Sequence, residues 1–142
     1  MREATRPGSP STLIPPVPRG KVLLVDGELD DLYYYSETLQ REGYQVQACP
    51  SYAEGLAALA AERFDFVVVA QGTAAFEGRV ILERVKEISR DIPVLVVARC
   101  HDIRCYIDAM HLGAIDYYEK PLRVSEIVRL VKNSVRARRP AT

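Results

Sequence analysis

Residues 64–72 read Phe-Asp-Phe-Val-Val-Val-Ala-Gln-Gly, and this stretch decides the fold class of the chain. Four consecutive β-branched or aromatic residues, Phe66 to Val69, leave no polar face for water, so they predict a strand that is buried on both faces. Such strands belong to parallel sheets covered by helices, where ligands bind beyond the carboxyl ends of the strands. The residue that closes this strand is Ala70, whose methyl group carries no chemistry.

A regular alternation of strand and helix patterns surrounds that stretch. Strands are predicted at 22–25, 44–48, 66–69, 94–97 and 115–118. Helices are predicted at 30–41, 79–88, 102–112 and 124–135, and a further helix is predicted to begin after a cap at Ser51. This order predicts an α/β fold: a flavodoxin-like (βα)5 three-layer sandwich whose parallel five-stranded sheet has the order 2-1-3-4-5. We expect the loops after strands one, three, four and five to meet at one edge of the sheet.

The length and composition of the chain suit one globular domain, because its 142 residues are 48% hydrophobic and 27% charged. We expect this domain at residues 19–138, between a proline-rich, disordered arm at 1–18 and a short tail at 139–142. No apolar run is long enough to span a bilayer, and the amino terminus lacks the pattern of a signal peptide. We therefore expect a cytoplasmic protein that does not engage a membrane.

The charges of the chain balance, with 19 basic and 19 acidic side chains, which argues against a general nucleic-acid binder. The basic residues are concentrated at the carboxyl end, where seven of them stand against one acid from Lys120 onward. A basic last turn complements the helix dipole without a partner. A small nucleic-acid-associated protein that uses this basic helix remains an alternative.

The chain has three cysteines, Cys49, Cys100 and Cys105. Their odd number and the lack of a CxxC pair favour free thiols in a reducing compartment. A second hypothesis is a redox sensor at Cys100 and Cys105, with Arg99 and Arg104 lowering the pKa of the thiols.

Five short motifs are spread along the chain: Lys21-Val-Leu-Leu-Val-Asp26, Glu42-Gly-Tyr44, Phe64-Asp-Phe-Val-Val-Val69, Ile92-Pro-Val-Leu95 and Gly113-Ala-Ile-Asp-Tyr117-Tyr-Glu-Lys120-Pro121. Together they resemble the receiver domain of bacterial two-component response regulators. The resemblance covers about residues 20–138, and its most specific part is the last motif.

The resemblance implies phosphoryl transfer from a histidine kinase to an aspartate at the end of strand three. That chemistry uses Mg²⁺ held by an acidic pair after strand one, a hydroxyl after strand four, and the lysine before proline. This chain matches the family at Asp26, Lys120 and Pro121, and departs from it at Gly27 in the acidic pair, at Ala70 in the phosphoacceptor position and at Ala98 in the hydroxyl position. We therefore expect a vestigial phosphorylation site with no catalytic residue, no cofactor, and weak or absent Mg²⁺ binding for which Asp26 is the only residual ligand.

Asp26 and Lys120 are expected to form a metal-free, one-to-one ion pair, because the other acids of the pocket are missing. Glu28 and Glu77 lie in loops, and neither is placed to act as a phosphoacceptor. Asp65 lies at the start of its strand, roughly 16 Å from Ala70, and is therefore at the wrong edge of the sheet.

Tyr117 occupies the position of the family's switch aromatic. The hydroxyl partner expected at position 98 is missing, so we expect a plain packing role for this side chain. Tyr33, Tyr34 and Tyr35 cannot all face inward from one helix, so at least one of them is expected to be exposed.

These observations indicate a degenerate receiver domain, not an enzyme, that acts in phosphorelay signalling through protein–protein interaction independent of phosphorylation. The resemblance implies three kinds of partner: a histidine kinase, an output domain, or a second copy bound through the fourth helix, fifth strand and fifth helix. A receiver that accepts phosphate at a non-standard residue is the other alternative left open.

Overall fold

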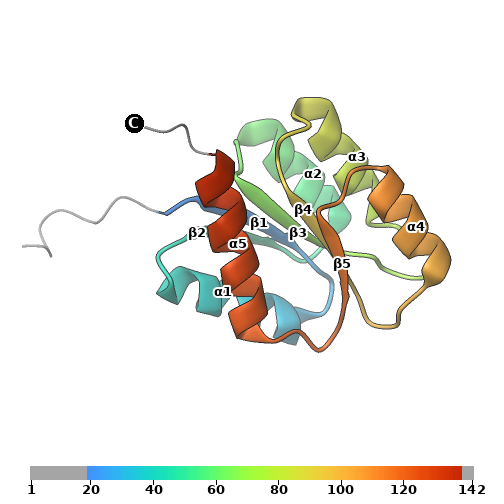
Figure 1. The fold of residues 1–142 in the computed structure, drawn as a ribbon, viewed down its shortest axis with the longest axis horizontal. Helices are drawn as coiled ribbons and strands as arrows, with labels where there is room; N and C mark the ends of the chain where they lie inside the picture. The colour runs from blue at the N-terminus through green and yellow to red at the C-terminus, as the bar shows by residue number, and fades with distance from the viewer. Residues whose placement is uncertain (1–18, 139–142) are drawn as a thin grey trace, which may run out of the picture.

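Residues 19–138 are described by a computed structural model (Figure 1). The predicted proline-rich arm at 1–18 and the tail at 139–142 lie outside the described residues.

The elements alternate as the sequence predicts. The strands are β1 (Lys21–Val25), β2 (Gln45–Cys49), β3 (Phe66–Ala70), β4 (Val94–Ala98) and β5 (Asp116–Glu119). The helices are α1 (Leu29–Arg41), α2 (Tyr52–Ala61), α3 (Arg79–Ile88), α4 (Ile103–His111) and α5 (Val124–Arg138). All strand pairs are parallel and the sheet order is β2-β1-β3-β4-β5, which confirms the predicted topology. None of the helices within residues 19–138 is long and apolar enough to cross a membrane.

The sheet is the middle layer of a sandwich, with α1 and α5 on one face and α2, α3 and α4 on the other (Figure 1). Successive residues of β3 point to opposite faces. Phe66 and Val68 pack with α1 and α5, whereas Val67 and Val69 pack with the other three helices. Both faces of the strand are buried, which explains why the stretch has no polar side.

Two helix starts near the carboxyl ends of the strands are fixed by side-chain caps. The Ser51 hydroxyl accepts a hydrogen bond from the Glu54 N–H at 3.2 Å, as the predicted cap of α2 requires. The Asp102 carboxylate accepts from two N–H groups in the first turn of α4.

The loop from β3 to α3 lies tightly against the end of β3. The Gly78 N–H donates to the Gln71 carbonyl at 3.0 Å, and a Cβ at position 78 would lie 2.1 Å from the Ala70 carbonyl oxygen. Only glycine allows this close approach. Gly72 in the same loop has a φ of +87°, a conformation that also favours glycine. The loop after β3 is therefore held in one position at the carboxyl ends of the strands.

Candidate functional site

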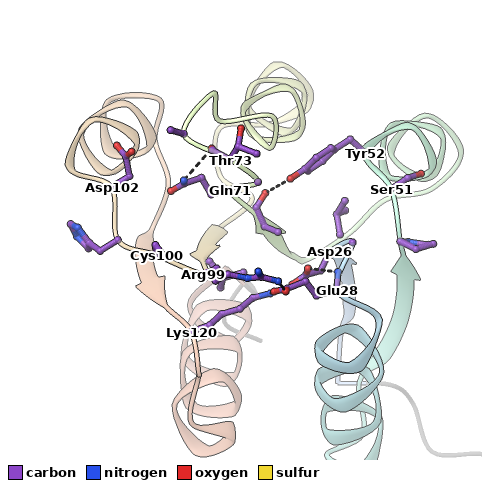
Figure 2. A pocket seen from close by; sticks show the side chains of 18 residues that line it. Asp26, Glu28, Ser51, Tyr52, Gln71, Thr73, Arg99, Cys100, Asp102 and Lys120 are labelled. Carbon is purple, nitrogen blue, oxygen red and sulfur yellow. Dashed lines mark hydrogen bonds and ion pairs between the residues drawn. The ribbon is translucent and has the colours of Figure 1, made fainter.

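A cavity of about 700 Å³ opens at the carboxyl ends of the strands (Figure 2). Its walls come from the loops after β1, β3, β4 and β5, as expected from the sequence, and also from Pro50, Ser51 and Tyr52 after β2. Val25, Ala70 and Val97 contribute apolar side chains to the lining. Ala70 closes β3, so a methyl group stands where the family resemblance requires a nucleophile.

Lys120 lies at the centre of an acidic cluster (Figure 2). Its ammonium nitrogen is 2.6 Å from Asp26 Oδ2, 2.9 Å from Glu28 Oε1 and 2.9 Å from Asp31 Oδ2. Glu28 also forms an ion pair with Arg99. The predicted contact of Asp26 with Lys120 is present, but the one-to-one count is wrong because two further carboxylates join it.

The sequence carried a signal for this larger cluster. Glu28 and Asp31 are three residues apart at the start of α1, a spacing that places two side chains on the same side of a helix. Arg99 follows directly after β4, whose end lies at the same edge of the sheet as Asp26. The cluster therefore sets three carboxylates against two cations.

Burial and the neighbouring charges shift the pKa values of the two most buried members. Burial raises the pKa of Asp26 above its ordinary value, and the hydrogen bond and charge of Lys120 oppose this change only in part. Burial disfavours the Lys120 ammonium, but the hydrogen bonds and charges of Asp26 and Asp31 outweigh it and raise the pKa of Lys120. Lys120 thus stays charged and supplies a fixed cation to the pocket.

The oxygen atoms of the cluster do not fit a divalent cation. Asp26 Oδ1 accepts a hydrogen bond from the Glu28 N–H at 2.9 Å, and its Oδ2 contacts Lys120. Gly27 and Ala70 supply no carboxylate to the pocket. Within residues 19–138, no group of three or more His, Cys, Asp or Glu side chains is arranged to hold a metal ion. One oxygen of each of these three acids is in contact with the Lys120 ammonium.

Tyr117 does more than pack in the core. Its ring is buried, its hydroxyl accepts a hydrogen bond from the Asp102 N–H at 3.1 Å, and the same hydroxyl donates to Gln71 Oε1. The partner that is missing at Ala98 is thus supplied by Gln71, which the sequence analysis did not single out. The available signal was a polar residue directly after a fully buried strand.

Tyr52 is a second residue that the sequence analysis missed. Its hydroxyl donates to the Ala70 carbonyl at 2.9 Å (Figure 2). Burial, together with the negative charges of Glu77 and Asp26, raises the pKa of Tyr52 to about 12. Glu77 accepts hydrogen bonds from the Thr73 N–H and hydroxyl, so this acid holds the loop after β3.

Three further predictions concern Ala98, Asp65 and the tyrosines of α1. Ala98 is buried, and its carbonyl accepts a hydrogen bond at 2.7 Å from the N–H of Lys120, the residue directly before Pro121. Asp65 accepts from the Lys21 N–H at 2.8 Å, at the opposite edge of the sheet as predicted. Tyr33 and Tyr34 are exposed and Tyr35 is buried, which confirms the expectation for α1.

The redox hypothesis is contradicted at Cys105. This thiol is buried, and burial together with the Asp102 charge raises its pKa instead of lowering it. Cys100 is exposed on the cavity wall and Cys49 is buried.

Comparison with known proteins identifies the family of this chain. The family model of the response regulator receiver domain matches residues 22–132. Sporulation initiation phosphotransferase F of Bacillus subtilis is 28% identical over 112 residues, which cover 79% of this chain and 90% of that protein. Transcriptional regulatory protein PcoR of Escherichia coli is 27% identical over 119 residues, or 84% of this chain, and the match spans only 53% of PcoR.

The solved structures agree on the fold. The CheY-like receiver domain protein from Methanospirillum hungatei superposes with a TM-score of 0.77 at 22% identity, covering 82% of this chain and 94% of that one. With the family model matched over residues 22–132, from β1 into α5, this chain belongs to the response regulator receiver domain family.

Proposed function

We propose that this chain is a degenerate receiver domain that acts in two-component signalling by binding other proteins, without aspartyl phosphate and without enzymatic activity. The observation that carries the proposal is Ala70, which closes β3 where the family's chemistry requires a carboxylate nucleophile. A methyl group cannot attack phosphorus. Asp65, the carboxylate that directly precedes β3, accepts a hydrogen bond at the opposite edge of the sheet.

The charge arrangement supports a pocket that works without Mg²⁺ or another cofactor. Lys120 and Arg99 already oppose the carboxylates that remain. Mg²⁺ in proteins is usually held by one or two carboxylates together with substrate phosphate, and here the carboxylates already contact cations of the chain itself. Weak or absent Mg²⁺ binding follows from this competition.

The surface proposed for partner binding is the α4 stripe, defined as Ile103, Tyr106, Ile107 and Met110. These side chains are 60%, 37%, 47% and 37% exposed. Their spacing places them on one face of α4, and Ile115 just before β5 is a further exposed apolar side chain. An exposed group of large apolar residues marks an interaction site. A histidine kinase, an output domain, or a second copy bound through α4, β5 and α5 is the partner that we propose.

Nucleic acid and membrane are not part of this proposal, and we place the protein in the cytoplasm. The charges of the whole chain balance, and Lys132 on α5 forms an ion pair with Glu42 at 3.3 Å. The basic helix thus has an acidic neighbour within the domain.

The test is the intact mass of the protein after incubation with acetyl phosphate and Mg²⁺. The expected result is no added phosphoryl mass, whereas a receiver domain that keeps the aspartate gains one group under the same conditions. A stoichiometric adduct on this chain would refute the proposal and favour a non-standard acceptor, which peptide mapping would identify.

A double variant, Gly27→Asp with Ala70→Asp, restores both missing carboxylates. Position 27 has room for the new side chain, because a Cβ there would lie 3.6 Å from the Pro50 carbonyl oxygen, which is an ordinary contact. If the double variant gains a phosphoryl group and the parent does not, these two positions account for the loss of phosphoryl acceptance.

A further inference from the structure

Gln71 is held rigidly at the end of β3. Its N–H donates to the Val97 carbonyl at 2.7 Å, its own carbonyl accepts from Gly78 at 3.0 Å, and the residue is 3% exposed. Since successive residues of an extended chain point to opposite faces, Gln71 lies on the side of the sheet opposite to Ala70. That side carries α2, α3, α4 and Tyr117.

The side-chain amide of Gln71 is used at both ends. Its Oε1 accepts a hydrogen bond from the Tyr117 hydroxyl. Its Nε2 donates to the Thr73 carbonyl at 3.2 Å (Figure 2). Turning this buried amide away would leave polar groups without partners, which is costly inside a protein. The Gln71 side chain therefore has one favoured orientation.

Tyr117 carries the connection onward to α4. Its hydroxyl accepts from the Asp102 N–H, and Asp102 Oδ1 in turn accepts from the Arg104 and Cys105 N–H groups at 3.0 Å each. The Tyr117 ring packs edge-on against His101 and Tyr106, with centroid distances of 5.3 Å and 5.7 Å. Because Tyr106 belongs to the α4 stripe, the same ring supports the proposed partner surface.

We infer that Gln71 is a positioning residue: it holds Tyr117 inward and thereby fixes the first turn of α4 and its apolar stripe in one arrangement. The inference rests on the proposed function, because it explains how a receiver without a phosphoacceptor keeps its partner surface in a single state. At position 98 the chain has only a methyl group, so Gln71 is the side chain among the described residues that accepts the hydrogen bond from the Tyr117 hydroxyl.

Amide hydrogen exchange on the full chain, without any phosphoryl donor, tests this inference. The variants are Gln71→Leu, Tyr117→Phe and the double variant. In Gln71→Leu, the amides from Asp102 to Tyr106 are expected to exchange about fivefold faster, the factor that corresponds to the loss of one ordinary hydrogen bond. Tyr117→Phe is expected to speed the same amides, and the double variant to add no further increase, because both changes break one chain of hydrogen bonds.

The matched control is Gln45→Leu, the same substitution at an exposed position of β2, which is expected to leave exchange in α4 unchanged. A purely structural role for Gln71 would speed amide exchange on both faces of the sheet alike, and its effect would add to that of Tyr117→Phe. Either of those results, or unchanged exchange at 102–106, would overturn the inference. The exchange measurement contains no phosphoryl donor, so it does not depend on whether the chain accepts phosphate. If the parent chain were later found to accept phosphate, the proposed function would be refuted but the result on Gln71 would still hold.

Discussion

Replacing Lys120 by methionine removes the cation that three carboxylates share. Methionine keeps most of the apolar stem of lysine, so the change acts mainly on charge. The side chains of Lys120 and Asp26 are only 9% and 7% exposed, whereas Glu28 and Asp31 are 35% and 36% exposed. The largest loss is therefore expected from the buried pair.

The magnitude follows from this burial. Removing one partner of a buried ion pair costs about 3–5 kcal/mol, because the other charge is left uncompensated. The two more exposed contacts each add at most about 1 kcal/mol. Domains of this kind are stable by about 5–15 kcal/mol, so the variant is expected to lose a large fraction of its free energy of unfolding.

Urea denaturation at neutral pH, followed by circular dichroism, measures the loss. The matched control is Lys132→Met, which breaks the more exposed pair with Glu42 and is expected to cost less than about 1 kcal/mol. Adding Asp26→Asn to Lys120→Met is expected to recover part of the loss, because no buried charge remains at position 26. A Lys120→Met variant that is as stable as the parent, or that loses no more than the control, would refute the reasoning.

The same variant has a definite pH dependence. Burial already raises the pKa of Asp26 in the parent, and removal of the Lys120 cation raises it further. A carboxyl group whose folded pKa lies above its unfolded pKa contributes stability at low pH that is lost as the pH rises through the folded pKa. Lys120→Met is therefore expected to approach the stability of the parent as the pH falls, and a gap that is constant from neutral to acidic pH would contradict this account.

Three further outcomes are expected. The difference between the ultraviolet titrations of the parent and Tyr52→Phe is expected to show one tyrosine that ionises near pH 12. Because this pKa lies above the ordinary value of about 10, the contribution of Tyr52 to stability is kept below about pH 10 and lost between about pH 10 and pH 12. Ionisation of Tyr52 near pH 10 in the folded protein would contradict this expectation. Gly78→Ala is expected to lower the free energy of unfolding by about 2 kcal/mol or more, because the new Cβ would lie 2.1 Å from the Ala70 carbonyl oxygen. A urea midpoint equal to that of the parent would argue against this close approach. Under native conditions iodoacetamide is expected to label Cys100 alone, and peptide mass mapping that finds the other two cysteines equally labelled would contradict their burial.

The fold was predictable because its signal is local. The apolar runs around Val67 and Leu95, and the turn after each, predict buried strands, and the alternation of strand and helix patterns predicts that these strands are parallel. The end of each strand also follows from the pattern, so Asp26, Ala70 and Lys120 could be assigned to one edge. The differences of one to three residues at element ends lie where helices fray and strands lose their partners.

The contents of the pocket were less predictable because they depend on the reach of side chains across the sequence. Glu28 and Lys120 are 92 positions apart, and nothing local to either residue shows that the lysine lies within hydrogen-bond distance of three acids at once. Gln71 is similar, since its role depends on which face it points to and on a hydroxyl 46 positions away. A count of charges at the family's positions missed both features, because it considered only those positions.

The two features share one physical consequence. In each, a side chain of this chain makes contacts within the pocket or beside it: Lys120 and Arg99 form ion pairs with the acids, and Gln71 accepts a hydrogen bond from the Tyr117 hydroxyl. These interactions form without phosphate or metal, so they do not by themselves report a signal. A two-state equilibrium shifts only toward the state that a ligand binds more tightly. Under the proposed function, the ligand with such a preference is a partner protein on the α4 stripe. The concentration of that partner, in place of phosphorylation, would then set the bound fraction.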